Sequence, residues 1–315
     1  MNITASMVKE LREMTGCGMM ECKNALVETD GNIEKAINYL RERGLAKAEK
    51  KIGRIAAEGV VASYAHSDGT FVMAEVNSET DFAAKSDVFG DFVKNILMQI
   101  AQNKPADLDT LLSQKCINDD SMDVNEYIKQ AIAKLGENLN VRRFIIYNKP
   151  EGSVIDSYIH MGGKIGVLVE LNFDGDKNSD ELKQTVKNIA MQIAASNPQF
   201  LDRTEISPEF IEKETEIQKA AAILEVREQG KPEDKVAMIA EKMVTGRIEK
   251  YLKEICLVDQ PYIIDPDIKV SNYLDNVGKT LNGKISIKRF ARFEKGEGIQ
   301  KKEENFAEEV AKQIK

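Results

Sequence analysis

Apolar residues at the start of the chain recur at helical spacing and predict three short helices within residues 1–44. Val8 and Leu11 share a face of the first helix, and Thr4 is placed to cap its N-terminus. After a break at residues 15–18 the same spacing continues in two further helices, with Met19, Cys22, Ala25 and Leu26 in one and Ile33, Ala36, Ile37 and Leu40 in the next. These apolar faces can pack together, so residues 1–44 are expected to form a compact three-helix module.

The third of these helices has signals at both of its ends. Asn32 follows the Asp30-Gly31 turn and can cap the start of the helix, and Gly44 is expected to end it. Residues 45–58 are charged and rich in alanine, a composition that favours an exposed helical linker to the next module.

The middle of the chain contains an internal repeat. Each copy has a Ser-Tyr-x-His segment, then an apolar strand that ends in Asn, then a helix of nearly identical sequence. These segments are 63–66, 71–77 and 93–105 in the first copy and 157–160, 165–172 and 186–198 in the second. A hairpin followed by a helix, present twice, predicts an α+β protein whose core has two related halves, each a sheet covered by helices.

The repeat sets the expected limits of these halves. The first half is expected over residues 59–150, with an inward stripe on its helix at Phe89, Phe92, Val93, Ile96 and Ile100. The second half is expected over residues 151–205 and 254–294, because another pattern interrupts it.

The interrupting segment, residues 206–253, predicts an antiparallel helical hairpin of the coiled-coil type. Ser207 and Pro208 supply an N-cap and a first-turn proline. Apolar positions recur along it at Phe210, Ile217, Ala221 and Leu224, stop at Gly230-Lys231-Pro232, and resume at Val236, Ala240 and Met243. After the second half, whose last strand is expected over residues 284–294, residues 295–315 are expected to form a C-terminal module with a charged helix from about Glu303 to Lys315.

Charge and composition exclude several classes of function. The formal net charge is −8, which disfavours binding to nucleic-acid phosphates because such binding requires a basic face. The chain has no Trp and 6% aromatic residues, so stacking platforms for single strands are not expected either. The charged N-terminus does not resemble a signal peptide, and no apolar run has the roughly 18 residues needed to span a membrane. With four cysteines and no zinc-type spacing, the chain is expected in the cytoplasm, without membrane contact or bound metal.

The motifs that could support catalysis fail on inspection. The segment 278–284 is similar to a phosphate-binding loop, but Ile285 stands where a Ser or Thr is required and a strand, not a helix, is expected to follow. Two histidines, His66 and His160, occupy equivalent repeat positions, which favours a shared structural role at a strand end. Cys22 falls on an apolar face, where a thiol is inert. The chain is therefore not expected to be an enzyme or to need a cofactor.

Two segments remain as candidates for an interaction surface. In one interpretation Asp81 caps a helix and Phe82 anchors it in the core; in the other they lie at a loop tip and present a wedge and a carboxylate to a partner. Met19 and Met20 are adjacent on a helix and point about 100° apart, so one of them is expected to be exposed.

At these residues the sequence resembles the bacterial elongation factor Ts family along its whole length. The blocks that carry the resemblance are ITASMVKELREMTGCGMMECKNAL, LRERGLAKAEKK, EVNSETDFAAK, SYIHMGGKIGVLV and RFEKGEGIQKKEENFAEEVAK. Cys17 and Ala83 depart from the family's usual alanine and valine, and both changes are small. Residues 107–126 do not align clearly, and no element is predicted for them.

The resemblance implies guanine-nucleotide exchange on elongation factor Tu. The N-terminal module would be similar to a ubiquitin-associated domain, and Arg12, Met19 and Met20 would contact the partner's nucleotide-binding domain. The segment Thr80, Asp81, Phe82 and Ala83 would displace the partner's Mg²⁺ and disturb its phosphate site, so that GDP leaves and GTP can rebind. His160 matches a position that contacts the partner's distal domains.

Other interpretations remain open at this stage. The helical hairpin could mediate dimerisation. An adaptor that binds through the three-helix module alone would need only residues 1–55, and an enzyme would reveal itself by a bound nucleotide or metal.

Overall fold

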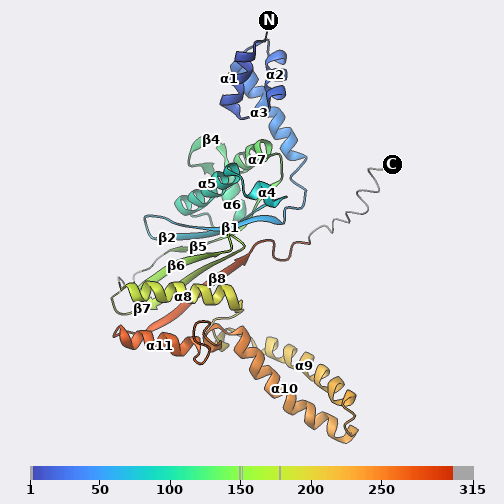
Figure 1. Cartoon of the computed structure of the whole chain (residues 1–315), viewed down its shortest axis with the longest axis vertical. Helices are drawn as coiled ribbons and strands as arrows, with labels where there is room; N and C mark the ends of the chain where they lie inside the picture. Colours follow the sequence, from blue (N-terminus) through green and yellow to red (C-terminus); the bar gives the residue numbers. More distant parts are fainter. Residues whose placement is uncertain (1–2, 149, 151, 177–178, 301–315) are drawn as a thin grey trace. The chain divides into compact units, whose positions relative to one another are not determined.

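The computed structural model describes residues 3–300 except 149, 151, 177 and 178, and these divide into two compact units. The first unit contains the chain up to Ile146, Ile159–Ile165 and the segment from Phe293; the second contains Tyr147–Tyr158 and Gly166–Arg292. Helices and small sheets are mixed in both units, which confirms the α+β class (Figure 1). The predicted helix at 303–315 lies outside the described residues.

The N-terminal module consists of α1 (Ala5–Thr15), α2 (Met19–Glu28) and α3 (Ile33–Glu49). Both predicted caps are present: the Thr4 hydroxyl accepts the Met7 N–H and the Asn32 side chain accepts the Lys35 N–H. The buried core of the module is made by Val8, Leu11, Cys22, Ala25, Leu26, Ala36 and Leu40. All seven were predicted from the apolar spacing; of the other predicted positions, Ile33 and Ile37 are partly buried against this core and Met19 is exposed.

The prediction that Gly44 ends the third helix is wrong, because α3 continues to Glu49. A Cβ atom at Gly44 would lie 3.1 Å from the Cβ of Ala133 on α7 (Val124–Leu135). The glycine therefore lets two helices approach closely instead of supplying a left-handed cap. Ala48 is fully buried in the core of the first half, so the start of the expected linker is a packed helix and not an exposed one.

The sheet of the first half has the strand order β1-β2-β5, formed by β1 (Glu58–Ala65), β2 (Thr70–Ser78) and β5 (Leu139–Asn148). The strands β1 and β2 pair antiparallel, with Val61 opposite Glu75. The short α4 (Asp81–Ala84) and the long α5 (Asp87–Asn103) follow β2. All five residues of the predicted stripe on α5 are buried against this sheet.

Residues 107–126, for which no element was predicted, contain α6 (Leu108–Ser113), β3 (Lys115–Cys116) and β4 (Asp119–Asp123) and lead into α7. Asp107 and Asp123 cap the two helices by accepting the N–H groups of Thr110 and Glu126. Elements this short carry too few apolar positions to show a period, which explains why the pattern did not reveal them.

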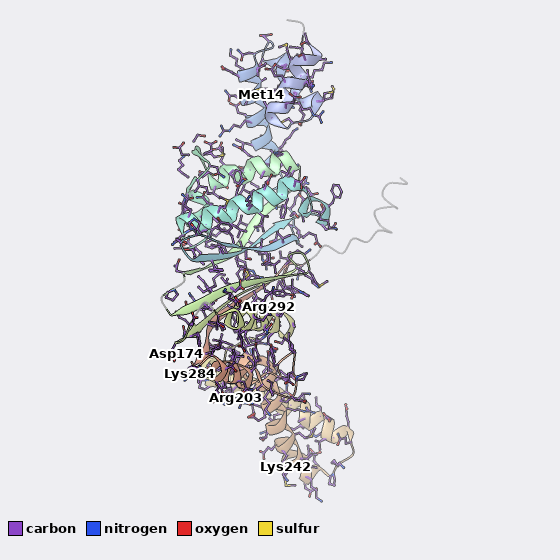
Figure 2. All side chains as sticks on the ribbon, turned by 60° about the vertical axis from the view of Figure 1, so that its left-hand side comes forward. Met14, Asp174, Arg203, Lys242, Lys284 and Arg292 are labelled. Carbon is purple, nitrogen blue, oxygen red and sulfur yellow. The ribbon has the colours of Figure 1, made fainter. Side chains whose placement is uncertain are left out.

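The second half repeats the arrangement with β6 (Ser153–His160), β7 (Ile165–Phe173) and β8 (Ile285–Glu294), in the order β6-β7-β8. The repeat helix is α8 (Asp180–Ser196), and α11 (Val270–Thr280) precedes β8. The turn between α11 and β8 is fixed by Asp174, whose carboxylate accepts the Lys284 N–H at 2.6 Å (Figure 2). A strand therefore follows the segment 278–284, which confirms the expectation that excluded a phosphate-binding loop there.

The helical hairpin is formed by α9 (Pro208–Glu228) and α10 (Glu233–Ile255). The apolar face predicted for α10 is confirmed, because Val236 and Ala240 are buried and Met243 is partly buried. The apolar face predicted for α9 is wrong. Ile217 and Leu224 are 53% and 62% exposed, whereas Ala222 and Val226 are buried. The small side chains of Ala222 and Ala240 lie in one cluster, because they allow the helices to pack closely where larger residues would separate them.

The base of the hairpin is held by Arg203 in a short 3-10 turn, η1 (Arg203–Glu205). Its guanidinium binds both carboxylate oxygens of Glu249 on α10 at 2.8 and 3.0 Å. It also binds Asp259 at 2.7 Å in a second 3-10 turn, η2 (Leu257–Asp259). A single guanidinium, on the segment before the hairpin, thus binds both the second helix of the hairpin and the segment that follows it.

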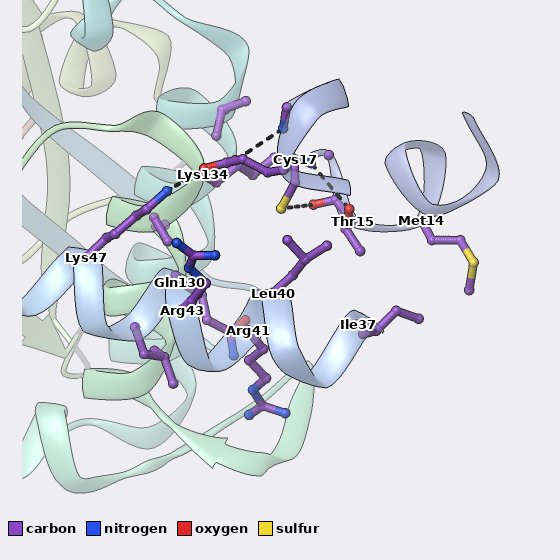
Figure 3. Close-up of a pocket in the computed structure, with 18 of the residues that line it drawn as sticks. Met14, Thr15, Cys17, Ile37, Leu40, Arg41, Arg43, Lys47, Gln130 and Lys134 are labelled. Atoms are coloured by element: carbon purple, nitrogen blue, oxygen red, sulfur yellow. Dashed lines mark hydrogen bonds and ion pairs between the residues drawn. The ribbon is translucent and has the colours of Figure 1, made fainter. Parts of the chain in front are cut away.

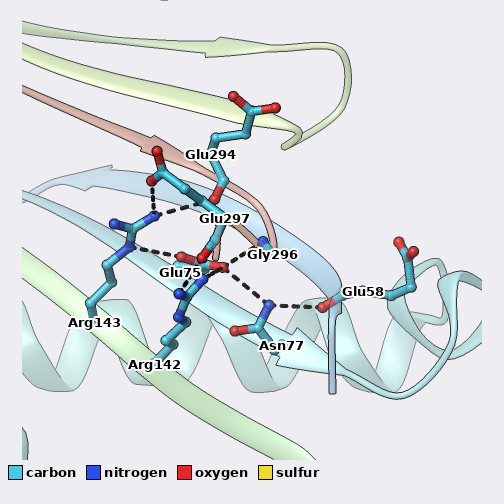
Figure 4. A network of polar contacts seen from close by, with 8 residues as sticks. All are labelled: Glu58, Glu75, Asn77, Arg142, Arg143, Glu294, Gly296 and Glu297. Carbon is cyan, nitrogen blue, oxygen red and sulfur yellow. Dashed lines mark hydrogen bonds and ion pairs between the residues drawn. The ribbon is translucent and has the colours of Figure 1, made fainter. Parts of the chain in front are cut away.

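Each half contains a fully buried glutamate on its central strand, a feature that the sequence analysis missed. Glu75 accepts hydrogen bonds from Arg142, Arg143 and the Gly296 N–H at 2.9, 2.8 and 2.7 Å (Figure 4). The equivalent residue of the second half, Glu170, is bound by two cations of β8, Lys288 at 3.0 Å and Arg289 at 2.6 Å.

Burial raises the pKa of the Glu75 carboxyl, but the hydrogen bonds from Gly296, Arg142 and Asn77 outweigh it, and the net pKa lies below its ordinary value. The pKa of Glu170 is lowered in the same way, against desolvation, by Lys288 and Arg289. Both carboxylates are therefore ionised at neutral pH and fix two strands of each sheet to one another.

Within the part of the chain that the structure describes, no helix combines the length and the apolar character needed to cross a membrane.

Replacing Gly44 by Leu is expected to destabilise the protein by about 1–3 kcal/mol, because the new side chain forces α3 and α7 apart. Gly246→Leu is the matched control: it is also a helical glycine, and no described atom lies within 4 Å of its Cβ position. Urea unfolding of the two variants and the parent checks this. Equal midpoints for Gly44→Leu and the parent would show that the close approach does not matter.

Replacing Glu75 by Gln is expected to lower stability at pH 7 by about 1–3 kcal/mol. The folded-state pKa of Glu75 is lowered, so its contribution is present above the unfolded-state pKa of about 4.3 and is lost as the pH falls through the folded-state value. The difference between parent and Glu75→Gln in urea unfolding should therefore shrink from pH 7 to pH 3. A constant difference across that range contradicts the assignment, and Glu42→Gln, at an exposed position, serves as control.

Candidate functional site

The segment after β2 is a tight turn that ends in the single helical turn α4. Thr80 has extended backbone angles, and its hydroxyl accepts the Ala83 N–H at 3.1 Å, so Thr80 is the N-cap. The interpretation that made Asp81 the cap is wrong by one residue. Ser86 then caps α5 by accepting the Phe89 N–H at 3.2 Å, so two caps in succession fix the path of the chain.

Phe82 is the most exposed large apolar side chain among the described residues, at 85% exposed. The interpretation of Phe82 as a core anchor is therefore wrong, and the loop-tip interpretation fits. Ala83 is buried instead and holds the turn against the first half. A side chain larger than alanine would have to be accommodated at this position, which is where the family has valine.

Asp81 lies beside Phe82, and its carboxylate forms an ion pair with Lys85 at 2.7 Å. Both side chains are largely exposed, so the ion pair contributes little to stability. The hydrogen bond from Lys85 lowers the pKa of Asp81, which keeps the carboxylate ionised at neutral pH. The turn thus presents one aromatic ring and one negative charge to solvent.

Glu137 is a residue of this site that sequence analysis missed. It follows Gly136, the left-handed residue that ends α7, and its carboxylate accepts both the N–H and the hydroxyl of Thr80. No pattern in the sequence signals this contact, because the two residues are far apart in the chain and neither belongs to a periodic element.

The equivalent position of the second half has a different structure. Asp174 follows β7 there and binds the Lys284 N–H, and the next helix that the structure describes, α8, begins at Asp180. Among the described residues, the exposed aromatic turn is therefore found after β2 and not after β7, although these two strands correspond.

The second group of candidate residues lies where α1 ends and α2 begins. Arg12 is exposed in the last turn of α1, and its carbonyl accepts the N–H of Gly16, whose positive φ of 67° ends the helix. Met19 and Met20 are 59% and 63% exposed. Both methionines are therefore exposed: the expectation that one of them would be exposed is confirmed, and the placement of Met19 on the apolar face of its helix is wrong.

The reason is that Met19 and Met20 occupy the first two positions of α2, before the helix reaches the core at Cys22. Met14, near the end of α1, is also 61% exposed and was missed. Three methionines in this stretch of sequence are therefore exposed, and methionine is a side chain that adapts well to contact surfaces.

His160 ends β6 and is partly buried. Its carbonyl accepts the Gly163 N–H at 3.2 Å, just as the carbonyl of His66 accepts the Gly69 N–H at 3.0 Å. Each histidine therefore begins the turn of a repeat hairpin, which is the shared structural role that its position indicated. The contact of His160 with a partner stays a prediction.

The candidate residues come from three separate segments of the chain. Thr80, Asp81, Phe82 and Ala83 share one turn, and Arg12, Met19 and Met20 share one helix junction. His160 lies at the end of β6.

An open cavity of about 740 Å³ is lined by residues of α3, α5, α7 and the α1–α2 junction (Figure 3). Its charged groups are mostly engaged: Lys47 pairs with Glu21, and Arg41 pairs with Glu126. No histidine lines it, and the described residues contain no group of three or more His, Cys, Asp or Glu placed to hold a metal ion. Its lining shows no constellation for covalent catalysis.

Comparison with known proteins gives one family. The family described as elongation factor TS matches residues 79–297. The elongation factor Ts of Clostridium novyi (strain NT) is 50% identical over 313 residues, which cover 99% of this chain and 99% of that protein. Those of Clostridium acetobutylicum and Trichlorobacter lovleyi are 50% and 46% identical, each covering 99% of this chain and 98% of the relative.

Replacing Phe82 by Ala is expected to change the free energy of unfolding by less than about 0.5 kcal/mol, because the ring makes little contact with the fold. Phe89→Ala, which removes a buried ring a few residues away, should cost about 3–5 kcal/mol. Urea unfolding compares the two. A large loss of stability in Phe82→Ala would mean that the ring packs in the core.

Proposed function

The chain belongs to the elongation factor Ts family of translation elongation factors, and from this premise we propose that it promotes guanine-nucleotide exchange on elongation factor Tu. The observation that carries the proposal is the Asp81-Phe82 turn. A phenylalanine that is 85% exposed on a backbone fixed by two successive caps is stable in solvent only because the turn prevents it from folding inward. Such a side chain is suited to enter an apolar site on a partner.

Phe82 acts as a wedge in the proposed mechanism. GDP is held largely by Mg²⁺ and by backbone N–H groups around its phosphates. Full burial of the ring in the partner is worth about 1.5–3 kcal/mol, enough to offset the distortion of such a site and to accelerate release about tenfold to hundredfold. Thr80 and Ala83 hold the turn, and Asp81 brings a negative charge toward the partner's Mg²⁺ and phosphate site.

The remaining contacts provide affinity. Arg12, Met19 and Met20 dock the three-helix module on the nucleotide-binding domain of the partner, and His160 contacts its distal domains. The exposure of both methionines supports this division, because two flexible apolar side chains offer more contact area than one.

Exchange by this route requires no covalent step on the chain. Coupling between two ligands of one protein is reciprocal, so a factor that weakens GDP binding is itself bound more weakly when GDP is present. The factor therefore speeds exchange in both directions, and the relative concentrations of GDP and GTP decide the outcome. Dimerisation through α9 and α10 stays a prediction.

Stopped-flow release of a fluorescent GDP from elongation factor Tu tests the proposal and separates the two roles. Phe82→Ala is expected to lower the maximal release rate about tenfold or more, and Asp81→Ala by a smaller factor, while the half-saturating concentration of the factor changes little. An equal loss of docking and maximal rate would contradict the wedge.

Met20→Ala is expected to give the opposite result in the same assay. It should raise the half-saturating concentration about threefold to tenfold and leave the maximal rate near that of the parent. Ile217→Ala, at an exposed apolar position of α9, serves as control. A Met20→Ala variant with normal docking would remove this residue from the binding surface.

A further inference from the structure

We infer that Glu137 is a positioning residue for Phe82, which it orients through Thr80 without touching the ring. The inference rests on the proposed exchange function and deepens it, because it identifies what holds the wedge in place. It starts from the length of α4, which is a single turn of four residues. A helix that short is not stable alone, since its first turn fixes several dihedral angles for one hydrogen bond.

The Glu137 carboxylate supplies the missing constraint. One of its oxygens accepts the Thr80 N–H at 3.0 Å, and the other accepts the Thr80 hydroxyl at 2.7 Å. A bidentate contact of this kind fixes both the position and the rotation of the N-cap residue. Both hydrogen bonds are exposed, so the constraint comes from their two-point geometry and from the charge of the acceptor.

The Thr80 hydroxyl transmits this constraint to the turn. It donates its proton to Glu137 and accepts the Ala83 N–H at 3.1 Å, so the two hydrogen bonds form a directed chain. Donation to a carboxylate increases the electron density on the hydroxyl oxygen and strengthens the bond that it accepts. Phe82 lies between the two residues joined by this chain.

A second contact anchors the same backbone. The Asn138 N–H donates to Glu79 at 2.6 Å, and the Asn138 side chain donates to the carbonyl of Arg54 at 2.7 Å. Asn138 is buried, and Glu79 also pairs with Arg54 at 3.5 Å. Glu137 therefore projects from a fixed backbone and is itself held rigidly enough to orient Thr80.

A double-mutant cycle in the GDP-release assay tests the inference. Glu137→Ala is expected to lower the maximal release rate about fivefold, roughly 1 kcal/mol, with an unchanged half-saturating concentration. In the Phe82→Ala background the same change should have no further effect, because a residue that acts only by orienting the ring loses its influence when the ring is absent. Glu137→Gln keeps one acceptor oxygen and should give an intermediate rate.

The controls separate positioning from folding. Asp120→Ala removes a negative charge at another exposed position and should leave the rate unchanged. The urea unfolding midpoint of Glu137→Ala should stay close to that of the parent. If it is much lower, Glu137→Gln replaces Glu137→Ala in the double-mutant cycle. Thr80→Val removes the hydroxyl that joins Glu137 to the Ala83 N–H, so its rate should match that of Glu137→Ala.

Two results would overturn the inference. A Glu137→Ala variant with the parent rate shows that the turn needs no support from Glu137. An equal loss in the parent and Phe82→Ala backgrounds shows that Glu137 acts independently of the ring. If the unmodified chain does not accelerate release, the proposed exchange function fails and the inference fails with it; an active parent with an unaffected Glu137→Ala variant overturns the inference alone.

Discussion

Phe82 remains in solvent because the short turn that carries it is fixed by hydrogen bonds from outside the turn. Thr80 is held by Glu137, and Ser86 begins the next helix within the same few residues. A large apolar side chain on a flexible loop would fold onto the nearest core and lose its availability to a partner. In the proposed function, the rigidity of this backbone keeps the ring available to a partner.

The surrounding fold provides that rigidity through a few close or buried contacts. Gly44 allows α3 to pack on α7, whose C-terminal end carries Glu137. Glu75 joins the central strand that leads to the turn with Arg142 and Arg143 of the neighbouring strand. The second half uses the same principle at Glu170, and there β7 is followed by Asp174, which binds the Lys284 N–H.

The periodic elements of the fold were predictable from the sequence, because amphipathic helices and repeated strands leave a strong pattern. Contacts that depend on the close approach of two helices were not predictable. A glycine such as Gly44 is also typical of a helix end. On α9, apolar spacing pointed to Ile217 and Leu224, whereas the buried residue in the contact is the smaller Ala222. For the candidate site, the resemblance pointed to Asp81 and Phe82. The structure then showed that Phe82 lies exposed at the tip of a turn and not in the core. Glu137 could not be found, since a single long-range hydrogen-bonding residue has no periodicity.

The central claim is that Phe82 passes from solvent into an apolar site when the partner binds. The chain contains no Trp, so Phe82→Trp places its single tryptophan at the tip of the turn, where it can be excited selectively over the tyrosines. Its emission spectrum should be that of an exposed indole in the free protein. On addition of elongation factor Tu bound to GDP it should shift to shorter wavelength, after subtraction of the spectrum obtained with the unmodified chain. A complex that forms with normal affinity but leaves the emission at the exposed position would contradict the account.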